Sequence, residues 1–181
     1  MNETSKAMMR RLRDPMFATR YFVGRAIDVG SGNDPLSRQL GFWPLLNSVD
    51  EWDVKDGDAQ LMQGVPDNSY DLVYSSHCLE HVHEPLPTLW RWLEVLKLHG
   101  HMVVSVPDFE MYERGIWPSR FNPDHKSTFG FERVAELLSS TKCEVIKVER
   151  IIAGFDPSLP VSVDQTQTGA ECAIEFIVRK Q

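Results

Sequence analysis

The sequence predicts an α/β fold in which a mostly parallel, twisted sheet carries helices on both faces. Residues 26–29 form a short apolar run bounded by glycines, which is typical of a strand buried on both faces of a parallel sheet. A glycine turn and a helix start at Asp34-Pro35 follow, with the aspartate as N-cap and the proline at the first helical position. Further along, a helical apolar period at 85–98 leads into a second apolar run at 102–106. We therefore expect alternating strands and helices.

Length and composition indicate one ordinary domain. The 181 residues are enough to bury a core, and the net charge of −7 disfavours a general nucleic-acid or anionic-membrane binder. The three cysteines, Cys78, Cys143 and Cys172, have no paired spacing, which favours a reducing compartment. The sequence has no apolar run of membrane-spanning length and no signal-peptide core, so we expect a soluble, cytoplasmic protein. Its oligomeric state is left open.

The first 25 residues are basic, with six lysines and arginines against two acids. One interpretation is a solvated helix that ends at Asp14-Pro15, with Met8, Met9 and Leu12 as its apolar side. The other is that residues 1–24 form a lid whose cations meet an anionic acceptor. Both interpretations remain open from sequence.

The glycine turn itself separates two classes of ligand. A dinucleotide-binding turn has a third glycine, which is absent here, and the acid at the helix start would repel a pyrophosphate. Asp28-Val29-Gly30-Ser31-Gly32 instead gives D-x-G-x-G, which resembles the first motif of class I S-adenosylmethionine-dependent methyltransferases. The resemblance implies a Rossmann-like fold, with Asp28, Gly30, Ser31 and Gly32 at the methionine end of S-adenosylmethionine.

The resemblance also implies a ribose-binding acid at the end of a second strand, which we expect near 47–52. Asp50 is favoured and Asp53 is next, with Glu51 as a further competitor. Asp58 and Ala59 resemble the family segment that meets the adenine. Only eight positions separate Asp50 from Asp58, so either the segment around the third strand is shortened or the register of the second strand is wrong. A plain surface turn is the alternative for residues 56–58.

Residues 65–82 strengthen the resemblance, which is to the type 11-like branch of the family. An apolar strand at 70–74 ends in Ser75, Ser76 and His77, and ligands of open α/β sheets bind beyond such carboxyl ends. We expect Ser75 and His77 near the cofactor, although His77 could also cap or pack the next helix. In Leu79-Glu80-His81, a common form of this segment, His81 is expected to be structural.

The remaining elements complete the predicted sheet. A helix at 85–98 covers it, a turn at 96–101 follows, and a helix is expected at 131–138. Strands at 143–152 and 171–179 resemble the antiparallel end of the methyltransferase sheet. His99 and His101 flank the turn without a partner at metal-site spacing, so no metal site is predicted.

A long segment at 108–128 mixes aromatic, charged and proline residues, and such loops are usually functional. We expect it to form the acceptor pocket. It resembles a loop of bacterial methyltransferases that modify glycans or small metabolites. The expected walls and polar contacts are Tyr112, Trp117, Phe121, Arg120, Asp124, His125 and Lys126.

The predicted reaction is in-line transfer of a methyl group from S-adenosylmethionine to a small-molecule or glycan acceptor. A hydroxyl acceptor must lose a proton, and His125 or His77 is the expected general base. A magnesium-assisted version would use Asp108 and Asp124. The alternatives are a nucleotide-dependent oxidoreductase and a catalytically silent cofactor-binding or partner-binding protein.

Overall fold

A six-stranded sheet organises residues 2–181, which are the residues that the computed structural model describes. The strand order is β2-β1-β3-β4-β6-β5. The strands are β1 (Gly24–Val29), β2 (Leu46–Trp52), β3 (Tyr70–Ser76), β4 (Leu96–Pro107), β5 (Cys143–Ile151) and β6 (Ala173–Lys180). The pairs among β1 to β4 are parallel, whereas β6 is antiparallel to both of its neighbours. The expected Rossmann-like sheet with an antiparallel C-terminal strand is confirmed.

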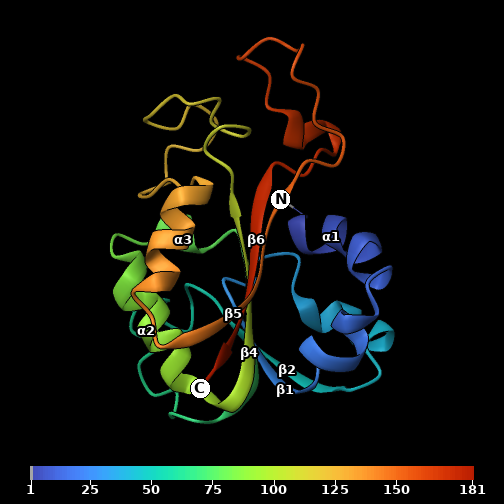
Figure 1. The fold of residues 1–181 in the computed structure, drawn as a ribbon, viewed down its shortest axis with the longest axis vertical. Coiled ribbons are helices and arrows are strands. Elements are labelled where there is room, and N and C mark those ends of the chain that lie inside the picture. The colour runs from blue at the N-terminus through green and yellow to red at the C-terminus, as the bar shows by residue number, and fades with distance from the viewer. Residues whose placement is uncertain (1) are drawn as a thin grey trace.

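Helices cover both faces of this sheet, as predicted (Figure 1). On one face lie α2 (Pro85–Val95) and α3 (Phe131–Ser139). On the other lie α1 (Glu3–Leu12), a π-helix (Phe17–Tyr21) and a 3₁₀ helix (Leu36–Phe42). Two short 3₁₀ helices, Leu79–His81 and Gln165–Thr168, stand in the loops at the carboxyl end of the sheet. No helix within residues 2–181 combines the length and the apolar character that a bilayer crossing requires.

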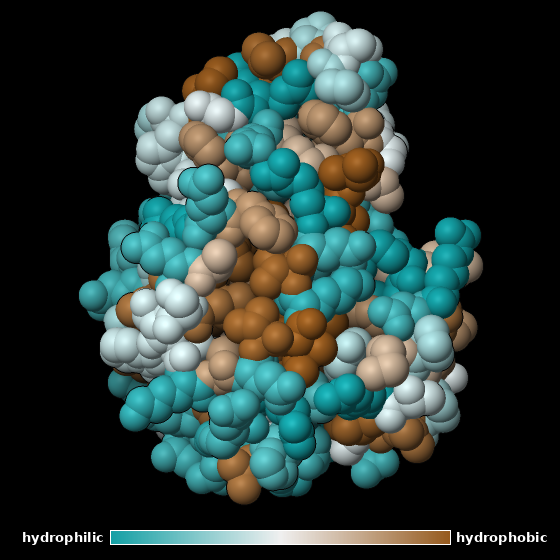
Figure 2. Space-filling model, viewed as in Figure 1, coloured by the Kyte–Doolittle hydropathy of each residue, from teal (hydrophilic) through white to brown (hydrophobic). Residues whose placement is uncertain are grey.

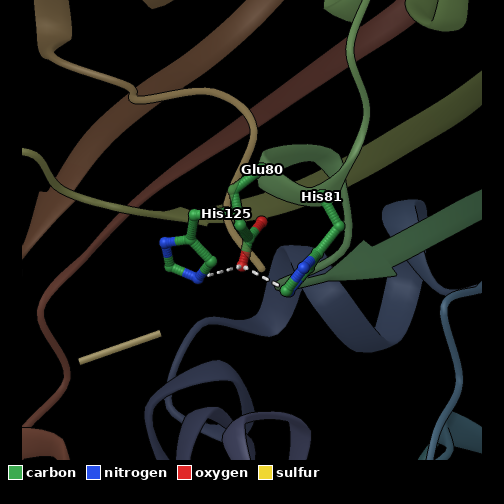
Figure 3. A group of neighbouring side chains, drawn as sticks. All are labelled: Glu80, His81 and His125. Atoms are coloured by element: carbon green, nitrogen blue, oxygen red, sulfur yellow. Dashed lines mark ion pairs between the residues drawn. The ribbon is translucent and has the colours of Figure 1, made fainter. Parts of the chain in front are cut away.

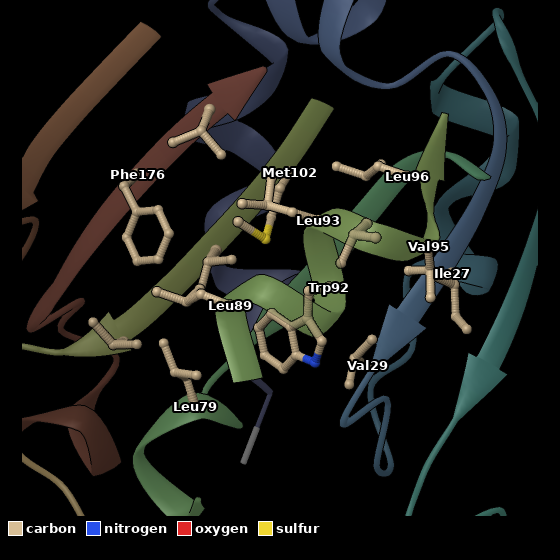
Figure 4. Packing of buried hydrophobic residues seen from close by; sticks show 14 of the residues in the cluster. Ile27, Val29, Leu79, Leu89, Trp92, Leu93, Val95, Leu96, Met102 and Phe176 are labelled. Carbon is tan, nitrogen blue, oxygen red and sulfur yellow. The ribbon is translucent and has the colours of Figure 1, made fainter. Parts of the chain in front are cut away.

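Successive side chains of the central strands alternate between two hydrophobic cores. Ile27 and Val29 of β1 join the core under α2 and α3, where Trp92 and Leu89 pack (Figure 4). Ala26 of β1 points the other way, into the core under the π-helix and the first 3₁₀ helix. Because both faces of β1 are buried, Ala26, Ile27 and Val29 are all apolar, which is why its sequence predicted a central strand.

The connection between β2 and β3 contains neither a helix nor a strand, since residues 53–69 form turns and loop. The predicted shortening around the third strand is therefore correct, and β2 is an edge strand. The predicted boundary after α2 is wrong by three residues. The helix ends at Val95 and β4 begins at Leu96. The expected turn at 96–101 is therefore a bulge in β4, where the register with β3 shifts between the pairs Tyr70–Leu96 and Leu72–His101.

The N-terminal helix lies against the protein with a side that matches the predicted one only in part, since Met8 packs against the core under the π-helix. Met9 and Leu12 are exposed, while Arg11 is fully buried. Its guanidinium donates to Glu175 Oε2 from Nε at 3.0 Å and to the hydroxyl of Tyr74 at 2.7 Å. Arg10 donates to the other oxygen of Glu175 at 2.8 Å. Because these cations are paired inside the protein, the structure does not support a lid whose cations meet an anionic acceptor.

Two long loops rise beyond the carboxyl end of the sheet, residues 108–128 and 152–172 (Figure 1). They pack on each other through Met111, Tyr112, Phe121, Phe155 and Cys172. Arg114 crosses between them and donates to the carbonyl of Pro157 at 3.2 Å. Figure 2 shows this upper part of the molecule above a face on which apolar side chains gather near the centre.

The buried charge cluster generates a first prediction. Glu175→Gln leaves Arg11 buried without its carboxylate, and breaking such a pair costs about 3–5 kcal/mol of the free energy of unfolding. Urea unfolding at neutral pH measures this loss. The matched control is Glu149→Gln, which removes the half-exposed partner of Lys147 and should cost less than about 1 kcal/mol. Equal losses in the two variants would contradict the role given to Glu175.

The same pair predicts a pH dependence. Burial alone would raise the pKa of Glu175, but Arg11 and Arg10 outweigh it and lower this pKa to about 2 from an ordinary 4.5. A carboxylate with a lowered folded-state pKa stabilises the protein fully above pH 4.5, and this contribution is lost as the pH falls toward 2. The difference in unfolding free energy between wild type and Glu175→Gln should therefore shrink as the pH falls below 4.5. A difference that stays constant over this range would refute the linkage.

Candidate functional site

Two adjoining cavities lie at the carboxyl end of the parallel strands and share Gly30 and His81. The first has a volume of about 270 Å³ and is lined by Glu3, Thr4, Gly30, Ser31, Gly32, Asn33, Asp34, Ser76, His77, Glu80, His81, Pro107, Tyr112, Asn122, His125 and Thr166. The second, of about 370 Å³, is lined by Gly30, Trp52, Asp53, Val54, Gly57, Asp58, Ala59, Gln60, Cys78, His81 and Val82. This edge is where open α/β sheets bind ligands.

The glycine turn after β1 forms the wall between the cavities. Gly30 and Gly32 have φ values of +78° and +50°, which residues with a Cβ rarely adopt. A Cβ on Gly30 would clash with the Cβ of Cys78, so the turn packs directly on the chain that follows β3. Ser31 completes the turn and also lines the first cavity. The structure thus brings together three of the four residues predicted for the methionine end.

The fourth, Asp28, lies beneath the turn and lines neither cavity. Its Oδ2 accepts from the backbone N–H of Leu36 at 2.7 Å, and burial raises its pKa to about 7. Asp28 therefore caps the 3₁₀ helix. The predicted N-cap at Asp34 is wrong, because Asp34 accepts instead from the backbone N–H of Ser5 at 2.8 Å and so ties α1 to the turn.

The second cavity contains three of the residues expected around the nucleoside, namely Asp53, Asp58 and Ala59. The preference for Asp50 is corrected by its position. Asp50 pairs with Ile27 in the middle of β2, and its carboxylate binds the guanidinium of Arg25 and the hydroxyl of Tyr70. Asp53, directly after the strand, is the acid that faces the cavity.

The end of β3 supplies one of its two predicted site residues. Ser75 is fully buried and donates from Oγ to the carbonyl of Val29 at 2.9 Å, so it joins β3 to β1 rather than lining a cavity. His77 does line the first cavity. Burial lowers the pKa of His77 to about 3, which keeps this imidazole neutral.

The predicted acceptor loop contributes only part of the expected set. Tyr112 and His125 line the first cavity, together with Asn122, which the sequence analysis missed. The other five residues lie outside both cavities: Trp117, Arg120, Phe121, Asp124 and Lys126. Arg120 binds the carbonyl of Val161 in the neighbouring loop. Asp108 is likewise unavailable for a magnesium site, because its carboxylate is buried against Arg150 at 2.6 Å.

A cluster of titratable groups lies where the two cavities meet, and all of its members except His81 are buried. Oε1 of Glu80 lies 3.9 Å from Nε2 of His81 and 3.9 Å from Nε2 of His125 (Figure 3). Nδ1 of His125 lies 3.0 Å from Oε1 of Glu113. Burial raises the pKa of Glu80 to about 8 and lowers the pKa of His125.

The roles of Glu80, His81 and Glu113 in this cluster were not predicted from the sequence. Glu80 and His81 belong to the motif at 79–81, but nothing in the sequence indicated that His125, more than forty positions later, would lie beside them.

The electrostatics of the cavities select a class of ligand. Three acidic side chains, those of Glu3, Asp34 and Glu80, line the first cavity, and Asp53 and Asp58 line the second. Glu3 is paired with Lys6 and the raised pKa of Glu80 favours its protonated form, so Asp34, Asp53 and Asp58 carry the negative charge of these walls. Within residues 2–181, no lysine or arginine lines either cavity. Such walls fit a cationic sulfonium and ammonium, and they disfavour a pyrophosphate, which needs donors and positive charge. The residues present therefore fit S-adenosylmethionine, and the fold and site define a Rossmann-like transferase that uses this cofactor.

A family model described as a methyltransferase domain matches residues 1–148. The chain belongs to this methyltransferase family, and it is an S-adenosylmethionine-dependent enzyme. The prediction of a class I methyltransferase is confirmed, and the alternative of a nucleotide-dependent oxidoreductase is wrong. No curated protein matches the sequence significantly.

Solved structures agree with this fold at low sequence identity. An S-adenosylmethionine-dependent methyltransferase from Archaeoglobus fulgidus superposes with a TM-score of 0.69 at 18% identity, covering 99% of this chain and 95% of its own. Phosphoethanolamine N-methyltransferase 2 from Haemonchus contortus, in complex with S-adenosyl-L-methionine, gives 0.66 at 16% identity, covering 95% and 52%. A methyltransferase from Haloferax volcanii in complex with the Trm112 activator gives 0.66 at 14% identity, covering 96% and 88%.

The positions of the two candidate ribose acids generate a prediction. Asp53→Asn should weaken binding of S-adenosylmethionine by about 10- to 100-fold, since hydrogen bonds to a charged group contribute about 1.5–3 kcal/mol. Asp50→Asn is the control and should bind normally, because Asp50 lies away from both cavities. Calorimetric titration of both variants measures the effect. Loss of binding in Asp50→Asn alone would instead identify Asp50 as the ribose-binding acid, as the sequence favoured.

Proposed function

We propose that this enzyme methylates a hydroxyl oxygen of a small neutral molecule or glycan, with His125 as general base. The observation that carries the proposal is the first cavity, whose lining holds carboxylates, hydroxyls and neutral imidazoles but no lysine or arginine among residues 2–181. An anionic acceptor would be repelled there, whereas a neutral polyol would find hydrogen-bond partners.

In this proposal the cofactor spans both cavities across Gly30. The turn at Gly30, Ser31 and Gly32 holds the methionine end, and Asp53 accepts hydrogen bonds from the ribose hydroxyls. Asp58 and Ala59 face the adenine, next to the indole of Trp52. When bound, S-adenosylmethionine supplies an activated methyl group, so alignment and exclusion of water can provide much of the rate.

His125 is the proposed base because its two ring nitrogens have separate environments. Nδ1 faces the carboxylate of Glu113 at 3.0 Å, which orients the ring and leaves Nε2 to accept the acceptor's proton. His77 is the weaker candidate, since a pKa of about 3 gives its imidazole little tendency to take up a proton near neutral pH.

Two segments are proposed to enclose the acceptor. Residues 2–24 form a cover through Glu3 and Thr4, which line the first cavity. The contact between Ser5 and Asp34 supports this role. Residues 108–128 supply the acceptor contacts through Tyr112 and Asn122. A cytoplasmic location also belongs to the proposal, supported by three cysteines that are all free thiols.

The base assignment is tested by His125→Ala, which should lower turnover by about 100- to 10,000-fold while leaving binding of S-adenosylmethionine intact. Release of S-adenosylhomocysteine measures turnover, and calorimetry measures binding. His83→Ala is the control, because His83 is exposed and lines neither cavity. Full turnover in His125→Ala would remove His125 as the base.

The acceptor class is tested with the same assay on a panel of neutral sugars, amino sugars and sugar acids. We expect turnover with a neutral member and none with the carboxylates, because the acidic walls repel anions. Turnover confined to carboxylates, or to amines, would overturn the proposed hydroxyl acceptor.

A further inference from the structure

We propose that Glu80, His81 and His125 form a binding site for one divalent cation, with Zn²⁺ as the ion that tests it. The three side chains offer one carboxylate oxygen and two imidazole nitrogens, and these donor atoms all lie within 4.8 Å of one another. Figure 3 shows both rings turned toward the carboxylate of Glu80. Bonds of about 2.0–2.2 Å would bring such donors about 3–4 Å apart, so the 3.9 Å separations need only a small contraction.

Both histidines are oriented as metal ligands usually are, with the second ring nitrogen held by an acceptor. Nδ1 of His125 faces the carboxylate of Glu113 at 3.0 Å, and Nδ1 of His81 lies 3.3 Å from the carbonyl oxygen of Asp124. A carbonyl can only accept, so Nδ1 of His81 carries the proton and Nε2 carries the lone pair. Each Nε2 then points its lone pair toward the carboxylate of Glu80, as metal coordination requires.

The buried carboxylates indicate a missing positive charge. Glu80 is 1% exposed and Glu113 is 2% exposed, and within residues 2–181 their only ion-pair partners are histidines. Oε2 of Glu80 and Oε2 of Glu113 have no hydrogen-bond partner. Burying carboxylates without compensation is costly, and a divalent cation would provide it.

The backbone fixes this cluster in place. The carbonyl of Glu80 accepts from the backbone N–H groups of Lys126 at 2.7 Å and of Ser127 at 3.0 Å. This contact holds the acceptor loop against the 3₁₀ helix of Glu80 and His81, so His125 stands beside them. All three donors line the first cavity, and the remaining coordination positions therefore face the space where we place the acceptor.

The donor set selects the kind of ion. Two imidazoles and one carboxylate suit zinc and other first-row ions such as Mn²⁺ and Fe²⁺, whereas Mg²⁺ and Ca²⁺ prefer oxygen ligands alone. With three protein ligands, at least one position stays open for a small molecule. A cation on Nε2 of His125 excludes a proton from the same atom, so cation binding and the proposed base function compete.

The test is calorimetric titration of the untagged, chelator-treated full chain with Zn²⁺. We expect one equivalent to bind, with affinity reduced at least about tenfold in Glu80→Gln and in His81→Ala. Glu113→Gln should weaken binding by about 10- to 100-fold, because it disturbs the support of His125 without removing a ligand. His83→Ala is the matched control and should bind as the wild type does. Since the His81 side chain is 37% exposed, its removal is compatible with folding even if Glu80→Gln proves unstable.

Absence of Zn²⁺ binding, or equal affinity in the wild type, Glu80→Gln and His81→Ala, would overturn the site. The result is independent of the proposed methylation, because the titration needs no acceptor. A protein that binds Zn²⁺ at this cluster but methylates no hydroxyl compound overturns the proposed function alone. A protein that methylates but binds no Zn²⁺ overturns the cation site alone.

Discussion

The buried ion pair between Arg11 and Glu175 is the interaction on which the position of α1, and with it one wall of the first cavity, depends. Glu175 stands on β6, the antiparallel strand inserted between β4 and β5, and Arg11 reaches it from α1. A buried carboxylate on a strand requires a cation, and the helix that brings this cation also brings Glu3 and Thr4 to the first cavity. One electrostatic requirement of the sheet thus fixes the wall of the site.

A second requirement concerns backbone groups at the carboxyl end of the sheet. The carbonyl of Glu80 is satisfied by Lys126 and Ser127, and this brings the acceptor loop to the 3₁₀ helix after β3. The two upper loops then hold each other, with Tyr112 between them. The histidines meet because main-chain hydrogen bonds place them, although they lie far apart in the sequence.

The acidic walls of both cavities explain how a protein with a basic N-terminal segment can bind a cofactor that carries cationic groups. The basic residues Lys6, Arg10 and Arg11 are turned toward carboxylates and carbonyls of the C-terminal part of the chain. Asp34, Asp53 and Asp58 face the cavities without a lysine or arginine partner among residues 2–181. The net charge of a segment therefore does not predict the charge of the surface that faces a ligand, because ion pairing decides which charged side chains remain without a partner.

The sequence by itself determined the elements whose signal is local. The apolar period of β1 and its glycine turn identified a central strand and a cofactor turn, because burial on both faces and positive φ values constrain residue type directly. The order of the motifs determined the family, and the eight positions from Asp50 to Asp58 indicated the shortened connection between β2 and β3. Only the tertiary structure decided which acid faces the nucleoside cavity, because a carboxylate in mid-strand and one just beyond the strand look alike in sequence. Only the tertiary structure showed that Arg11 is buried and that Glu80, His81 and His125 lie together. The pairing of polar side chains that are distant in sequence depends on three-dimensional packing, which no local sequence pattern encodes.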